Sequence, residues 1–363
     1  MFSNLDTTSL PIVDASAFIN GGTGDIKECE KLIECLRKYG CLAIKDPRVD
    51  DNQNQNFLDS LEIYFENTSK AYYSGKEVSD IKPQYAYQVG ATPDKTEKAR
   101  NHALTVKDKF KNDLPDTPQP PPANGLWRFF WRVGEISSED SKLLPPQVIP
   151  EGYPHWETTM DGWGYLMRNS IFTVSEMIAL GYGWNRNTLT ERMEGACQLL
   201  APTGSDLSKY NQHKDILAGF HYDLNFITVH GKSRYPGLSV WTRDGTKMEV
   251  KVPEGCVLIQ AAKQLEWLTG GDIEAGYHEV VVSEKTLASI EQKKAAGKTN
   301  LWRVSSTMFS QMRFDSILEP LEQFSTEENR KNYPPTLTYK QVEDELKEIG
   351  LLKQDSYNAE SKA

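Results

Sequence analysis

The stretch Gly219-Phe220-His221-Tyr222-Asp223-Leu224-Asn225 contains a His-x-Asp pattern inside a segment rich in β-branched and aromatic residues. That composition predicts a single strand over residues 220–230. Side chains alternate between the two faces of a strand, so His221, Asp223 and Asn225 are expected on the same face. One strand would then supply two metal-binding side chains and a polar neighbour.

A second histidine, His278, lies 57 positions after His221 (278 − 221) in the segment Gly276-Tyr277-His278-Glu279-Val280. Residues 277–283 (YHEVVVS) have the composition of another strand. Two imidazoles and one carboxylate on one face are the ligand set of a non-haem Fe(II) centre, which leaves its other positions open for O2 and a co-substrate. His221, Asp223 and His278 are therefore the candidate ligands of an Fe(II) site.

A third strand-like run, residues 302–309, places Arg303, Ser305, Thr307 and Phe309 on a shared face. An arginine and a hydroxyl on an inward face suit a buried carboxylate, because the guanidinium pairs with carboxylates in a bidentate way. Arg303 and Ser305 are the candidates for binding the distal carboxylate of 2-oxoglutarate.

With these residues the chain resembles the isopenicillin N synthase-like branch of the Fe(II)/2-oxoglutarate-dependent dioxygenases, over nearly its whole length. Residues 10–14 (LPIVD) are similar to the opening strand of that family, and residues 35–44 to its helix-then-strand passage. Residues 236–241 (PGLSVW) resemble the family's Gly-Leu-Gln-Val strand. The amino-acid sequences of three segments are similar to those of a subgroup found in plants and algae: residues 221–226, 259–264 and 303–307.

The resemblance implies a mainly β fold with a double-stranded β-helix (jelly-roll) core and appended helices. It also implies Fe(II), O2 and 2-oxoglutarate, which is converted to succinate and CO2. The coupled reaction would oxidise an unactivated C–H bond of a small-molecule substrate, by hydroxylation, desaturation or oxidative ring closure.

The sequence departs from the family pattern in two places. Many members hold 2-oxoglutarate with an Asn and a Tyr, where this chain has Ala201, Pro202 and Thr203. In addition, Arg303 follows His278 by 25 positions (303 − 278), farther than is usual in the family. The intervening residues 284–298 are charged and Ala-rich, which predicts an inserted short helix ending at Gly297.

Periodicity along the chain predicts three parts. Residues 1–195 are expected to form a mainly helical region that packs on the barrel, with apolar residues at helical spacing over 156–182. Residues 196–320 change to short strands and are expected to form the jelly-roll core with the Fe(II)/2-oxoglutarate site. Residues 321–363 are expected to form a C-terminal helix and a tail.

Net charge, hydrophobicity and cysteine content limit the kinds of partner and the cellular compartment that are expected. A net charge of −10 disfavours attraction to nucleic-acid phosphates, so no nucleic-acid partner is expected. No window approaches the ~18 consecutive apolar residues of a membrane span, and no signal peptide is visible, which favours a cytoplasmic location. Five cysteines without a CxxC pair suggest reduced thiols. The oligomeric state is left open.

The substrate pocket is predicted from strand faces and aromatic segments. Asn225 shares the face of the metal ligands, and Phe309 and Gln311 continue the face of Arg303. Tyr85 and Tyr87 are predicted to form a lid, as the corresponding N-terminal region does in the family.

Two further residues complete the predicted pocket. Arg128, in an unusually aromatic segment, suggests an anionic substrate, and a small acidic, amino-acid-derived metabolite is preferred. Trp267, just before the second-histidine strand, is placed at the entrance. The other histidines are not expected to bind metal: His230 is predicted as a polar contact at a strand end, and His102, His155 and His213 as exposed.

Three other functions are compatible with the same residues. The first is a 2-oxoglutarate-independent non-haem iron oxidase that takes all four electrons from its own substrate. The second is a catalytically inactive jelly-roll binding protein, which the complete ligand set disfavours. The third is a cupin-type isomerase or zinc hydrolase, which would not need Arg303 and Ser305.

Overall fold

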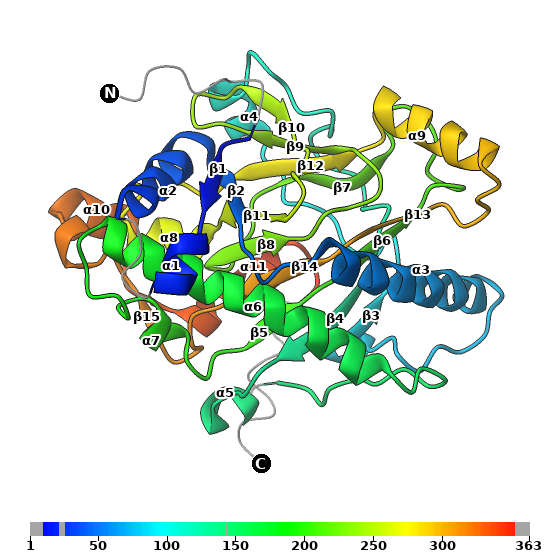
Figure 1. The fold of residues 1–363 in the computed structure, drawn as a ribbon, viewed down its shortest axis with the longest axis horizontal. Helices are drawn as coiled ribbons and strands as arrows, with labels where there is room; N and C mark the ends of the chain where they lie inside the picture. The colour runs from blue at the N-terminus through cyan, green and yellow to red at the C-terminus, as the bar shows by residue number, and fades with distance from the viewer. Residues whose placement is uncertain (1–9, 22–25, 143, 353–363) are drawn as a thin grey trace.

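The computed structural model describes residues 10–21, 26–142 and 144–352, and it shows two β-sheets with helices packed against the larger one (Figure 1). The larger sheet is mixed, because β1 and β2 are parallel whereas its other pairs are antiparallel. The strands of this sheet lie in the order β1 (Ile12–Asp14), β2 (Cys41–Lys45), β11 (Cys256–Ala261), β8 (Ile227–His230), β14 (Thr307–Ser310), β5 (Gln198–Leu200), β4 (Trp127–Val133), β6 (Thr203–Asp206) and β13 (Trp302–Ser305), with β3 (Gly90–Thr92) paired to β4.

The smaller sheet is antiparallel and consists of β10 (Lys247–Glu249), β9 (Leu238–Trp241), β12 (Tyr277–Val281) and β7 (Ile216–His221). The chain passes from this sheet into the larger one between β7 and β8, which is how a jelly roll is built from two sheets. The predicted mainly β architecture with appended helices is therefore confirmed.

Two predicted strands are each interrupted. The run 220–230 is not one strand, because β7 ends at His221 and β8 begins at Ile227 in the other sheet. The run 302–309 is likewise divided at Ser306, where β13 pairs with β6 and β14 pairs with β8 and β5. β-Rich composition marks both runs correctly as sheet-forming, but it does not show where the chain changes sheets.

Helices pack against one side of the large sheet, and the longest of them, α6 (Trp156–Gly181), crosses it (Figure 1). Its buried residues, including Met160, Met167, Ile171 and Val174, recur at three- and four-residue steps, so the predicted long helix is confirmed. Gly164 permits a close approach, since a Cβ atom there would lie 2.6 Å from a methyl group of Val133 in β4. The helices α2 (Ile26–Tyr39) and α3 (Asp51–Tyr73) flank α6.

The predicted helix inserted before Arg303 is confirmed as α9 (Glu284–Ala295), which Ser283 caps. The predicted C-terminal helix is α11 (Thr338–Glu348). The remaining elements are short: α1 (Ser16–Gly21), α4 (Ala103–Lys109), α5 (Ser138–Lys142), α7 (Thr190–Met193), α8 (Lys263–Leu268), α10 (Glu327–Asn332), the 3₁₀ turns Pro83–Tyr85 and Glu322–Phe324, and the strand pair β15 (Ile317–Leu318) and β16 (Thr336–Leu337).

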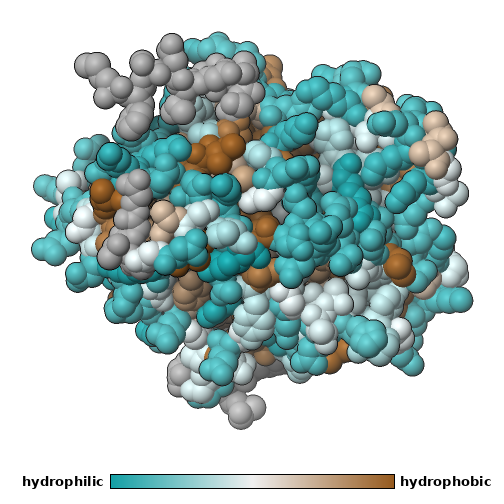
Figure 2. All heavy atoms as spheres, viewed as in Figure 1, coloured by the Kyte–Doolittle hydropathy of each residue, from teal (hydrophilic) through white to brown (hydrophobic). Residues whose placement is uncertain are grey.

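The large sheet extends across residue 195, where the sequence suggested a boundary. Strands β1 to β4 come from the segment before that position, and two of them pair with strands from the segment after it: β2 pairs with β11, and β4 pairs with β5 and β6. None of the helices in the described residues has the length and apolar character needed to cross a membrane. The face shown in Figure 2 is mainly hydrophilic, with small scattered apolar areas.

Candidate metal centre and substrate cavity

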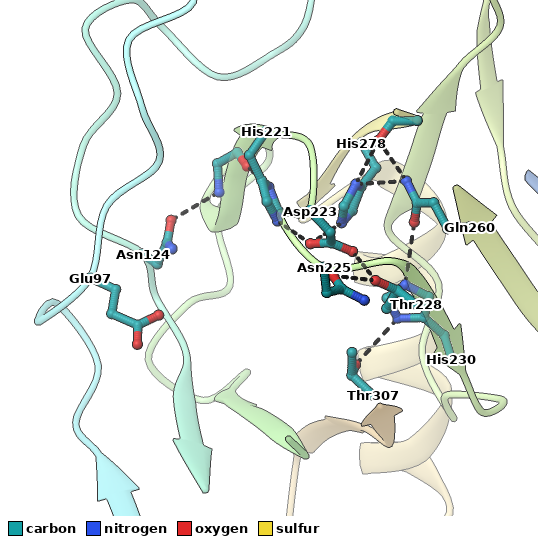
Figure 3. Close-up of polar contacts among 12 residues, drawn as sticks. Glu97, Asn124, His221, Asp223, Asn225, Thr228, His230, Gln260, His278 and Thr307 are labelled. Carbon is teal, nitrogen blue, oxygen red and sulfur yellow. Dashed lines mark hydrogen bonds and ion pairs between the residues drawn. The ribbon is translucent and has the colours of Figure 1, made fainter. Parts of the chain in front are cut away.

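The structure brings His221, Asp223 and His278 together at the junction of the two sheets (Figure 3). His221 ends β7 and lies directly opposite His278 in β12, so both imidazoles point to the same side. Asp223 follows in the segment that crosses to the large sheet. One ligand atom from each residue lies within 4.8 Å of the others, with His221 Nε2 3.6 Å and His278 Nε2 4.0 Å from Asp223 Oδ1.

Neighbouring groups fix the orientation of each candidate ligand. His221 Nδ1 lies 2.6 Å from the carbonyl oxygen of Gly219, so Nδ1–H donates there and Nε2 keeps its lone pair for a metal. Asp223 Oδ2 accepts a hydrogen bond from the hydroxyl of Thr228 at 2.5 Å, which leaves Oδ1 facing the histidines.

His278 is oriented by Gln260, a fully buried residue of β11. The Gln260 side-chain nitrogen lies 2.8 Å from His278 Nδ1, and the Gln260 oxygen lies 3.3 Å from His230 Nε2. His230 also contacts the hydroxyl of Thr307, which agrees with the prediction of a polar contact at a strand end.

The ionisation of these residues suits metal binding. Burial raises the pKa of Asp223, but His278 and His221 together lower it by more, so its pKa lies below the usual range and the carboxylate is ionised. Burial, and then the charge of His221, lowers the pKa of His278 to about 3, which keeps the imidazole neutral near pH 7. Neutral imidazoles and an ionised carboxylate are the forms that ligate metals.

Arg303 and Ser305 of β13 line a cavity of about 630 Å³ that also reaches His230, beside the metal-ligand cluster. Arg303 is 7% exposed, and burial lowers its pKa to about 10. Its Nε donates to the carbonyl of Pro236, but no carboxylate in the described residues pairs with it. A buried guanidinium without a counter-ion is costly, so this cavity is suited to an anion.

A second cavity, of about 170 Å³, opens on the other side of the cluster and contains His221 and Asp223 directly. We call it the substrate cavity. Of the residues predicted to contact the substrate, the structure places four on its wall: Asn225, Arg128, Phe309 and Gln311.

Three predicted substrate contacts are not on this wall. Tyr85 is 41% exposed at the end of a 3₁₀ turn, and Tyr87 follows the turn, whereas Gln88, three positions after Tyr85, does line the cavity. Trp267 lies on the far side of α8, where its indole nitrogen donates to Pro334 and its ring packs on Tyr333. The sequence around these three residues shows that the segments are aromatic, but it does not show which way each side chain points in the fold.

Several cavity residues had no usable signal in the sequence. Glu97 and Asn124 come from connecting segments, and α11 covers the cavity with apolar side chains such as Leu346. The prediction that His102 is exposed is wrong, because it is 7% exposed and packs edge-on against Phe220. These positions depend on contacts between distant segments.

No protein-family model and no curated protein matches the chain. Solved structures do match its fold. Neurospora crassa T7H in complex with alpha-KG superposes with a TM-score of 0.71 and 16% identity, over 95% of this chain and 98% of that one. JOX2 in complex with 2OG, Fe and JA gives 0.64 and 15%, over 92% and 83%. The rice dioxygenase for auxin oxidation gives 0.63 and 15%, over 93% and 95%.

The chain has the fold of the 2-oxoglutarate–iron oxygenases. The jelly-roll core that the sequence resemblance led us to expect is therefore confirmed.

Replacing Gln260 by Leu is expected to weaken metal binding about 10- to 100-fold, because the Gln260 amide lies 2.8 Å from His278 Nδ1 and holds the ring in place. With Nε2 free for a metal, Nδ1–H is the donor, so the amide must present its oxygen to it, and the carbonyl of Gly276 at 3.4 Å is a second acceptor. Isothermal titration with Fe(II) or Mn(II) under anaerobic conditions measures the change. Gln264→Leu is the matched control, since Gln264 is equally buried but contacts Gln311 and Gln341 instead of a histidine. Equal metal affinity in the two variants would contradict the role of Gln260.

Lowering the pH from 7 to 5 is expected to destabilise the metal-free protein by about 2 kcal/mol through His278. The pKa of His278 is about 3 in the folded chain, against 6.5 for an unperturbed histidine, so only the unfolded chain takes up the proton in this range and stability rises with pH. Urea unfolding of wild type, His278→Gln and His213→Gln at both pH values tests this. His278→Gln should lose about 2 kcal/mol of the pH dependence and keep the part that comes from the other buried histidines, His102 and His230, whose pKa values are also lowered. His213→Gln, at an exposed position, should keep all of it.

Proposed function

We propose that this protein is a non-haem Fe(II)/2-oxoglutarate-dependent oxygenase that oxidises an unactivated C–H bond of a small metabolite. The observation that carries the proposal is the cluster of His221, Asp223 and His278, with ligand atoms within 4.8 Å of one another between two separate cavities. One cavity contains a buried arginine that forms no ion pair with the described residues, and the other is small and partly apolar. The fold shared with oxygenases of known structure supports the same conclusion.

In this proposal His221, Asp223 and His278 would hold Fe(II) through Nε2, Oδ1 and Nε2, and the pKa values of Asp223 and His278 already favour the ionised carboxylate and the neutral imidazole near pH 7. The metal, when bound with 2-oxoglutarate and O2, would supply the oxidising power for removing hydrogen from a C–H bond, with 2-oxoglutarate converted to succinate and CO2. Two histidines and one carboxylate leave the coordination positions that such chemistry needs.

Arg303 and Ser305 would bind the distal carboxylate of 2-oxoglutarate. A carboxylate there gives the guanidinium its missing counter-ion and a charge-assisted hydrogen bond. His230 also lines this cavity, on the side toward His278, and so offers a polar group where many family members use Asn and Tyr. Ala201, Pro202 and Thr203 do not line it.

The chain's remaining task is to position the substrate and exclude water. The substrate cavity lies under α11, which Arg100 attaches to the rest of the wall through an ion pair with Glu345. Phe309 and Leu199 of the large sheet complete its apolar side. A substrate held there would have its C–H bonds beside His221 and Asp223.

We further propose a small, amino-acid-derived acid as substrate. Both arginines of the cavity are ion-paired, Arg128 with Glu97 and Arg100 with Glu345, so neither is a simple anion site. Lys98 at the exposed rim has no carboxylate within ion-pair distance among the described residues, and it could bind an acidic group. Proteins of the same fold take small ligands, as the complexes of T7H with thymine and of JOX2 with JA indicate.

Anaerobic titration of the Fe(II)-loaded protein with 2-oxoglutarate is expected to produce the weak visible charge-transfer band of an iron–keto-acid chelate. Asp223→Ala should lose the band because it loses a ligand. Bound iron without the band in wild type would favour the 2-oxoglutarate-independent oxidase, and absence of metal binding would favour a catalytically inactive binding protein. Turnover is then followed as succinate formation.

Replacing Arg303 by Met is expected to weaken 2-oxoglutarate binding by at least about 30-fold, roughly 2 kcal/mol, since a buried charge partner is lost. The same anaerobic titration gives the dissociation constant. Lys251→Met is the control, because Lys251 lines the same cavity but is exposed. A similar small change in both variants would contradict the assignment of Arg303.

A further inference from the structure

The inserted helix α9 borders the cavity that contains Arg303. It follows β12 in the chain and lies at the same end of the molecule as β13, the strand that carries Arg303 (Figure 1). Lys285, in the first turn of α9, and Pro236 both line this cavity. The insertion that separates Arg303 from His278 in the sequence is therefore a neighbour of Arg303 in the fold.

One backbone carbonyl connects α9 with Arg303. Arg303 Nε donates to the carbonyl oxygen of Pro236 at 3.2 Å, and the hydroxyl of Thr286 donates to the same oxygen at 3.3 Å. Thr286 is the third residue of α9 and is fully buried. A carbonyl oxygen has two lone pairs, so it can accept from both donors at once.

The segment around Pro236 is held at two further points. Tyr235 packs in an apolar cluster that it shares with α9, and Lys293 Nζ of α9 lies 4.0 Å from the centre of its ring. Gly237 has a φ of +126°, and a Cβ atom there would lie 2.6 Å from the carbonyl oxygen of Val281, so this close approach requires glycine. The Pro236 carbonyl is therefore fixed between α9 and the end of β12.

The contact with Pro236 decides which part of the Arg303 guanidinium is available to a ligand. Nε is occupied, whereas Nη1 and Nη2 have no partner among the described residues and are not closed off from the cavity. A carboxylate can therefore pair with the Nη1–Nη2 edge in a bidentate way. Because the guanidinium is planar and Nε is held, the position of that carboxylate is restricted as well.

We propose, resting on the proposed function, that Thr286 is a positioning residue for the co-substrate. Through the Pro236 carbonyl it holds the Arg303 guanidinium at one distance from the metal ligands. A keto diacid must span that distance, so Thr286 contributes to the selection of a molecule of the length of 2-oxoglutarate. The inserted helix then has a role in co-substrate recognition in addition to connecting β12 with β13.

Thr286 also belongs to the N-terminal cap of α9, and Ser283 provides the control for that structural role. Ser283 N donates to Thr286 Oγ1 at 3.1 Å, and Thr286 N donates to Ser283 Oγ at 3.3 Å, which together form a capping box. Thr286→Val removes one of these two hydrogen bonds and the hydroxyl at Pro236. Ser283→Ala removes the other hydrogen bond of the box and leaves the hydroxyl at Pro236 in place.

The experiment is anaerobic titration of the Fe(II)-loaded full chain with 2-oxoglutarate and with 2-oxoadipate, which is one methylene longer. Thr286→Val should weaken 2-oxoglutarate binding about three- to tenfold, the effect of one hydrogen bond, and Thr286→Ser should restore it. Wild type should bind 2-oxoglutarate at least about tenfold tighter than 2-oxoadipate. Thr286→Val should reduce this ratio at least about threefold, because Arg303 can shift. Ser283→Ala should keep the wild-type affinities for both acids, although it lowers the urea midpoint.

Unchanged 2-oxoglutarate binding in Thr286→Val, an unchanged ratio of the two acids, or the same loss in Ser283→Ala would overturn the proposal. If Thr286→Val does not fold, Thr286→Ala provides the test, since it also lacks the hydroxyl and places no methyl group beside the carbonyl. Failure of the proposed function is seen separately, in wild type that binds metal but gives no 2-oxoglutarate band. That result would overturn both proposals, whereas a normal wild-type band with an unaffected Thr286→Val would overturn only this one.

Discussion

The antiparallel pairing of β7 with β12 places His221 directly opposite His278, and the organisation of the site depends on this register. Directly opposed residues share a face, which brings the two imidazole rings to 4.1 Å between centroids. A slip of one residue would turn one histidine to the other face of the sheet. Because β7 ends at His221, the chain can turn immediately toward the large sheet and place Asp223 against both rings.

Two cavities with different charged residues lie beside the metal-ligand cluster that is formed where the chain passes from the small sheet to the large one. On one side, β13 contributes Arg303, which pairs with no carboxylate of the described residues, and on the other, Glu97 of a connecting segment pairs with Arg128 of β4. A carboxylate bound beside Arg303 would give the buried guanidinium a counter-ion and offset the cost of its burial.

The charge of the substrate cavity illustrates why a residue type alone does not define a ligand. Arg128 suggested an anionic substrate from the sequence, but in the fold its guanidinium is paired with Glu97, a residue 31 positions earlier (128 − 97). The pairing balances the charge of Arg128, so this arginine is not by itself an anion site.

The sequence by itself determined the long helix α6, the inserted helix α9 and the candidate metal ligands, because these follow from periodicity and local spacing of residue types, whereas the jelly-roll core was expected from the resemblance to a known family. Only the tertiary structure decided that Asp223 lies in a crossing segment rather than a strand, that Tyr85, Tyr87 and Trp267 do not line the substrate cavity, and that Glu97 and His102 do. The physical reason is that the first group depends on short-range periodicity, whereas the second depends on which distant segments meet, and single-sequence composition carries no information about those contacts.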